Sequence, residues 1–85
     1  MYYRIRKDKK DELQGGRTIT YLADICGCSR VFLSYTFNGY EKRKTTKQLA
    51  EKIISEISKE SVSVNRKVQE LGIGGALDYY FEKIK

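Results

Sequence analysis

The spacing of apolar residues predicts a short helix that begins near residue 19. Four of these residues recur at helical intervals: Ile19, Leu22, Ala23 and Cys26. These intervals of 3, 4 and 7 residues place them on one face. Thr18 precedes the pattern and is a good N-cap, whereas Gly27 follows it and readily adopts the left-handed conformation that ends a helix.

A second helix follows almost immediately, because Ser29 is another N-cap candidate. Helical spacing is shown by Phe32, Leu33, Thr36 and Phe37. The pair Asn38-Gly39 tolerates positive φ and ends the pattern. The sequence therefore predicts two short helices joined by a tight glycine turn, with the small Ala23 at their contact.

Two longer stretches downstream read as supporting helices. Thr45 or Thr46 caps a helix over 46–58. The apolar face of this helix contains Leu49, Ala50, Ile53, Ile54 and Ile57. Another helix starts at Ser63, aligns Val64, Val68 and Leu71, and stops at Gly72, where the letters GIGG predict a break or hinge.

The end of the chain has the spacing of one more amphipathic helix. Leu77, Tyr80, Phe81 and Ile84 lie at i, i+3, i+4 and i+7. Such an aromatic stripe either forms a homodimer interface or closes the core of a single chain.

The N-terminus leaves three alternatives open. Residues 8–16 suit a short helix that ends at Gly15-Gly16, with Leu13 as its clear apolar residue. The alternation of Tyr3, Ile5 and Lys7 suits a short strand instead. A basic arm that wraps DNA is the third alternative, with Arg4, Arg6, Lys7, Lys9 and Lys10 on phosphates.

Composition indicates one small globular domain. The chain has 85 residues, 40% of them hydrophobic, 33% charged and none of them proline. We expect a cytoplasmic protein with no membrane span, because no apolar run is long enough and the N-terminus lacks a signal-type apolar stretch.

The net charge of +6 is concentrated in two segments. Residues 1–17 carry six Lys/Arg against three acids, and residues 40–52 carry five against two. Between them, residues 18–39 carry only Asp24 and Arg30. This pattern favours a polyanionic partner such as nucleic acid over a merely solvated surface.

The sequence lacks the residue combinations of the common catalytic and metal sites. There are two cysteines and no histidine, so a four-ligand zinc site and a Cys-His nucleophile are both excluded. The letters GIGG lack the Lys-Ser/Thr of a phosphate-binding loop. We expect no enzyme, no cofactor and no metal, and interpret Cys26 and Cys28 as packing residues.

Residues 19–39 resemble the helix–turn–helix of the phage-repressor family (lambda repressor/Cro, XRE-like). The family places alanine at the fifth position, glycine at the ninth, apolar residues at the tenth and fifteenth, and often Asn-Gly at the end. These positions are occupied by Ala23, Gly27, Cys28, Leu33 and Asn38-Gly39. Two departures are Ile19, where the family usually has glutamine, and Thr36, where it usually has an apolar residue.

The resemblance implies an all-α helix–turn–helix domain of about five helices, spanning 1–85, in which the helix over 29–37 reads the major groove of double-stranded DNA. The residues expected to face DNA are Thr18, Ser29, Arg30, Val31, Ser34, Tyr35, Lys42, Arg43 and Lys44. Arg30 suits a bidentate contact to guanine, and Val31 suits a thymine methyl group. Thr18 and residues 42–44 are expected on phosphates.

We therefore expect a repressor-like transcriptional regulator of phage or mobile-element type. One alternative is a phage-type inhibitor or anti-defence factor on the same fold, which would bind a protein through Val31, Phe32 and Tyr35. Another alternative is an architectural or recombination accessory factor that also binds DNA.

Overall fold

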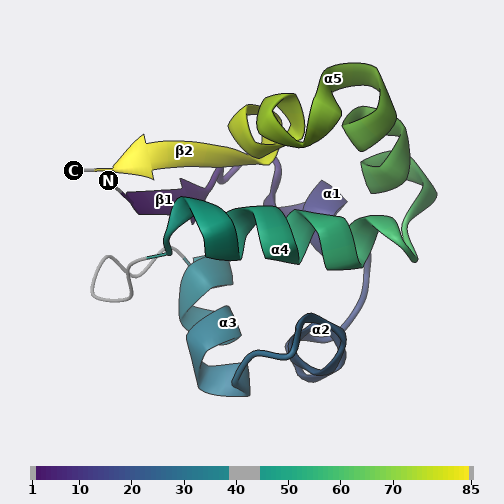
Figure 1. The fold of residues 1–85 in the computed structure, drawn as a ribbon. Helices are drawn as coiled ribbons and strands as arrows, with labels where there is room; N and C mark the ends of the chain where they lie inside the picture. Colours follow the sequence, from purple (N-terminus) through teal and green to yellow (C-terminus); the bar gives the residue numbers. More distant parts are fainter. Residues whose placement is uncertain (1, 39–44, 85) are drawn as a thin grey trace.

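The structure of the chain is a computed structural model, which describes residues 2–38 and 45–84. These residues form five helices and a two-stranded antiparallel sheet (Figure 1). The elements in chain order are β1 (Tyr2–Ile5), α1 (Lys10–Gln14), α2 (Ile19–Cys26), α3 (Arg30–Asn38), α4 (Lys47–Ser58), α5 (Val62–Tyr80) and β2 (Phe81–Ile84). The mostly helical architecture confirms the predicted fold class.

Helix α4 is the centre of the packing. It crosses the molecule between the α2–α3 pair and the layer formed by α5 and the sheet (Figure 1), and it packs directly on α2 and α5. Its buried residues Ala50, Ile53, Ile54 and Ile57 repeat at helical spacing, as the sequence predicts. The Thr46 hydroxyl caps its start by accepting a hydrogen bond from Leu49 N at 3.2 Å.

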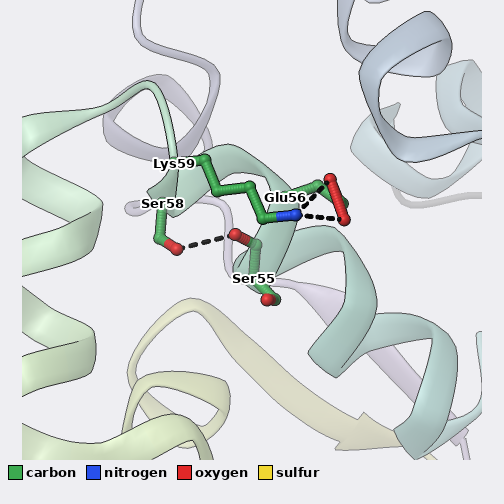
Figure 2. Close-up of polar contacts among 4 residues, drawn as sticks. All are labelled: Ser55, Glu56, Ser58 and Lys59. Atoms are coloured by element: carbon green, nitrogen blue, oxygen red, sulfur yellow. Dashed lines mark hydrogen bonds and ion pairs between the residues drawn. The ribbon is translucent and has the colours of Figure 1, made fainter.

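The C-terminal end of α4 is closed by its own side chains (Figure 2). The Ser58 hydroxyl donates to the Ser55 carbonyl oxygen at 2.7 Å, and Lys59 Nζ lies 3.0 and 3.2 Å from the two carboxylate oxygens of Glu56. A positive charge here also interacts favourably with the negative end of the helix dipole. The turn into α5 follows at once, where Ser61 caps that helix.

Helix α5 is broken at Gly72, which confirms the predicted interruption. Gly72 has φ 76° and ψ 170°, a conformation that only glycine adopts without strain. Leu71 and Ile73 on either side are 48% and 37% exposed, so Leu71 does not belong to the buried face that the sequence predicted. The core instead receives Ala76, Leu77 and Tyr80 from the second half of the helix.

The predicted C-terminal helix is wrong beyond Tyr80. Residues Phe81–Ile84 leave the helix and pair with Tyr2–Ile5 as an antiparallel ladder in which Ile5 faces Phe81 and Arg4 faces Glu82. The two ends of the chain consequently lie side by side (Figure 1). The apolar spacing at 77–84 is a local pattern, so it could not predict pairing with a strand at the other end of the sequence.

The sequence left open whether the aromatic stripe near the C-terminus forms a dimer interface or closes the core of a single chain. Leu77, Tyr80 and Phe81 are 2%, 0% and 1% exposed within one chain, and Ile84 is half-buried. In the structure, this stripe therefore closes the core of the single chain. Leu77, Tyr80 and Phe81 are therefore not exposed on the surface of the single chain.

The N-terminus combines two of the three alternatives and contradicts the third. Tyr2–Ile5 is a strand and Lys10–Gln14 is a short helix held in the core by Leu13. All of the basic side chains named for the arm except Lys7 bond to the folded domain, which is not the arrangement of an arm. Arg4 pairs with Glu82 at 3.2 Å, Arg6 Nε donates to the Asp78 carbonyl oxygen at 3.0 Å, and Lys9 Nζ lies 4.4 Å from the centre of the Tyr79 ring.

Candidate functional site

The α2–α3 pair is joined by the tight glycine turn that the sequence predicts. Gly27 has φ 67°, and its N–H bonds to the Ala23 and Asp24 carbonyl oxygens, while Cys28 N bonds to Ala23 O at 3.0 Å. These bonds satisfy the free carbonyls at the end of α2 in the manner of a Schellman motif. Ala23 is buried at the contact, so its small side chain allows the two helices to approach closely.

The inner face of α3 attaches it to the core. Leu33 and Phe37 are 0% and 3% exposed, and Ser29 Oγ caps the helix by accepting from Phe32 N at 3.0 Å. Thr36 is also buried, although its side chain is polar. Its hydroxyl donates to the Phe32 carbonyl oxygen at 2.9 Å and lies 3.4 Å from the Thr45 hydroxyl, so burial does not leave it unsatisfied.

The outer face of α3 brings together the residues that the sequence assigned to DNA. Val31 is 51% exposed and Tyr35 is 37% exposed, and Arg30 is exposed beside them. With Ser34 and Ile19 from the start of α2, these three residues line one shallow depression. Arg30 is the only charged residue of α3, so its guanidinium supplies the positive charge on this face.

Thr18 lies at the same side of the pair as Arg30. Both residues line a second shallow depression, which runs along α2 past Tyr21 and Asp24. The Thr18 hydroxyl accepts a hydrogen bond from Tyr21 N at 3.1 Å, so it caps α2 and can still donate its own hydrogen to a ligand. The exposed N-terminus of α2 and the Arg30 side chain can therefore meet one extended anion.

A line of polar groups continues from α3 to the N-terminal segment. Asn38 Nδ2 lies 3.3 Å from Ser34 Oγ, one turn earlier on the helix. On its other side, Asn38 Oδ1 accepts from Lys10 Nζ at 3.4 Å. Residues 30, 34 and 38 are spaced by four, so this line extends the outer face of α3 to its C-terminal end.

The orientation of α2 is fixed by bonds to the turn between α4 and α5. Arg17 Nη2 donates to the Glu60 carbonyl oxygen at 2.9 Å, and the Tyr21 hydroxyl donates to the Glu60 carboxylate. This second bond raises the pKa of Tyr21, because the carboxylate favours the phenol that keeps its proton. These contacts anchor the start of α2 to the turn between α4 and α5.

Three of the residues expected on phosphates are not part of this description. Lys42, Arg43 and Lys44 lie outside the described residues.

Cys26 is in the core, Cys28 is half-buried and packs against it, and both thiols are free. Burial raises the pKa of the Cys26 thiol to about 12, which is the behaviour of an inert packing residue and not of a nucleophile.

Two residues of the site, Ile19 and Asn38, were missed by reasoning from the sequence. Ile19 was assigned only to the apolar face of α2, and Asn38 only to the turn that ends α3. The spacing of Arg30, Ser34 and Asn38 is a signal that would have found Asn38. The contact of Lys10 with Asn38 spans 28 positions and has no local signal.

No family of proteins, curated protein or solved structure gives a significant match to this chain. Within the part of the chain that the structure describes, no helix has both the length and the apolar character needed to cross a membrane.

Proposed function

We propose that this chain is a sequence-specific DNA-binding protein of repressor type, in which α3 enters the major groove. The observation that carries the proposal is the outer face of α3. It exposes Arg30, Val31 and Tyr35 while Leu33 and Phe37 hold the helix rigidly in the core. A helix that reads bases must present such a face on a fixed support.

Each exposed group suits a different part of the groove. Arg30 can donate two hydrogen bonds to O6 and N7 of one guanine, and Val31 can contact the methyl group of thymine. Ser34 and Tyr35 can bond to a base edge or to a phosphate. Thr18 and the N-terminus of α2 are suited to a phosphate on the groove wall, because free N–H groups and the helix dipole attract an anion there.

The charge of the chain supports the same proposal. A net charge of +6 attracts a polyanion, and the nearly uncharged α2–α3 segment leaves readout to a few polar groups. Residues 42–44 remain proposed phosphate contacts in the segment after α3. Binding in this mode at a promoter would occlude it, which is the simplest route to repression.

The test is titration of the protein into a random duplex and into DNA from upstream of its own gene, at several salt concentrations. We expect tighter binding to the upstream DNA and a loss of affinity of roughly 10³-fold or more between about 50 and 200 mM salt if six or more phosphates are contacted. Arg30→Ala should lose about 1–3 kcal/mol of discrimination. Arg66→Ala removes another exposed arginine, from α5, and is the matched control.

A protein-binding function is the competing interpretation, and one observation favours it. Val31 and Tyr35 expose apolar surface beside the half-buried Phe32, and a protein partner would cover that surface. Absent or salt-independent DNA binding would contradict the DNA proposal. The search would then turn to a protein partner that is lost in Val31→Ser and Tyr35→Ser.

A further inference from the structure

A hollow lies between the turn that joins β1 to α1 and the C-terminal end of α3. Its walls include Arg6, Lys7 and Lys10 from the N-terminal segment and Phe37 and Asn38 from α3. Helix α3 thus has the candidate base-reading residues near its start and a group of cations beside its end. The function proposed above gives these cations no role.

The balance of charge in the hollow is positive. Arg4 and Glu82 also line it, but they pair with each other at 3.2 Å across the ladder. The remaining charged groups are Arg6, Lys7 and Lys10 against Asp8 and Asp11. Arg6 is held by its bond to the Asp78 carbonyl oxygen, whereas the exposed Lys7 forms no hydrogen bond or ion pair within residues 2–38 and 45–84.

The hollow continues the face that we propose to read DNA. Lys10 Nζ contacts Asn38 Oδ1, and Asn38 Nδ2 contacts Ser34 Oγ on the outer face of α3. At a rise of about 1.5 Å per residue, Asn38 lies about 12 Å along the helix axis from Arg30. The major groove is also about 12 Å wide, so a helix whose start meets base edges carries its other end to the phosphates of the groove wall.

We infer that this hollow binds a backbone phosphate of the same DNA duplex, with Lys7 and Lys10 as its cationic ligands. The inference rests on the proposed DNA binding and extends its footprint to the N-terminal segment. These lysines position the duplex and carry no base information, because phosphates are the same in every sequence. In this arrangement, the two lysines contact DNA from the folded turn between β1 and α1, and not from an arm.

The experiment measures DNA affinity against salt for the double variant Lys7→Ala/Lys10→Ala. Two lost phosphate contacts should reduce the slope of log affinity against log salt by about 1.8. The wild type should then lose roughly tenfold more affinity than the variant between about 50 and 200 mM salt. Preference for the upstream DNA should be unchanged.

Two control variants make the result specific. Lys59→Ala/Arg66→Ala removes the same charge from the end of α4 and the start of α5, and neither residue lines the hollow. We expect it to keep the wild-type slope. Lys7→Arg/Lys10→Arg keeps both charges and should also keep that slope, whereas a fold damaged by substitution would not be rescued in this way.

The outcomes separate the two proposals. If the wild type binds with a preference that needs Arg30, but the Lys7/Lys10 variant keeps its slope, the inference is overturned and the proposed function stands. An equal loss of slope in the Lys59/Arg66 control also overturns it, because only overall charge would then matter. If the wild type does not bind DNA, the proposed function itself fails.

Discussion

Thr36 shows how one polar residue is accommodated in the buried face of α3. Its hydroxyl bonds to the Phe32 carbonyl oxygen and faces the Thr45 hydroxyl at 3.4 Å in the interior. The residue that departs from the resembled family pattern is therefore part of a small buried polar pair. A pair of this kind is stable only while both hydroxyls are present.

A double-mutant cycle tests this pair. We expect Thr36→Val to lower the free energy of unfolding by about 1–3 kcal/mol, because the buried Thr45 hydroxyl loses this neighbour while the shape is unchanged. The variant Thr36→Val/Thr45→Val should recover most of the loss, since no hydroxyl then remains to be satisfied. Chemical denaturation of the four proteins measures the coupling, and strictly additive effects would contradict it.

Cys26 makes stability depend on pH on the alkaline side. Burial raises its pKa to about 12, against about 9 in an unfolded chain. Above about pH 9 the unfolded state releases this proton and the folded state keeps it, so the free energy of unfolding falls as pH rises. At about pH 10 the loss from this group should be about 1.5 kcal/mol.

The measurement compares denaturation at pH 8 and pH 10 for the wild type and for Cys26→Ala. The variant starts less stable, because a buried group is removed from the core. It should nevertheless lose less stability than the wild type over this interval. A parallel decrease in both proteins would show that the Cys26 thiol is not responsible.

At the scale of elements, Gly27 is the residue on which the α2–α3 turn depends. Its φ of 67° is unfavourable for a residue with a Cβ, although the added atom would only make ordinary contact with Lys52 Nζ at 3.6 Å. We therefore expect Gly27→Ala to cost about 1–2 kcal/mol through the backbone. Gly74→Ala is the matched control, because Gly74 lies in α5 with open space around it and no positive φ.

Thermal unfolding of both glycine variants distinguishes the backbone effect from a general effect of adding a methyl group. Gly27→Ala should melt lower than the wild type. Gly74→Ala should be unchanged or slightly more stable, since alanine favours a helix. Equal destabilisation by the two changes would contradict the role given to the left-handed turn.

The elements differ in how much of them the sequence could predict. The α2–α3 pair and α4 were predictable because caps, apolar spacing and glycine act within a few residues of one another, as Thr18 and Gly27 do. The strand at Phe81–Ile84 was not predictable, since its hydrogen-bond partner is at the other end of the chain. The outer face of α3 follows from local spacing and was foreseen. The contact between Lys10 and Asn38 joins residues that are far apart in the sequence and was not foreseen.

For the whole molecule, the pairing of the two chain ends joins the separate parts into one cooperative unit. β1 receives β2 along one edge, and on the other side Tyr3 N donates to the Thr45 carbonyl oxygen at 2.8 Å. It also packs against α3 and α4. The ends of the chain therefore support the residues that precede α4 and, through them, the α2–α3 pair.

Phe81 tests this role because it is 1% exposed in β2 and faces Ile5 across the ladder. Phe81→Ala should cost about 3–5 kcal/mol, a large part of the stability of a domain of this size. At about 4–8 °C per kcal/mol, Tm should fall by roughly 15 °C or more. Lys83→Ala, an exposed change in the same strand, should leave Tm almost unaffected.

The loss in Phe81→Ala should also be independent of protein concentration, because the ring is buried within one chain. A Tm difference that disappears on dilution would instead place Phe81 at an interface between two copies and contradict the role of the strand pair in the single chain.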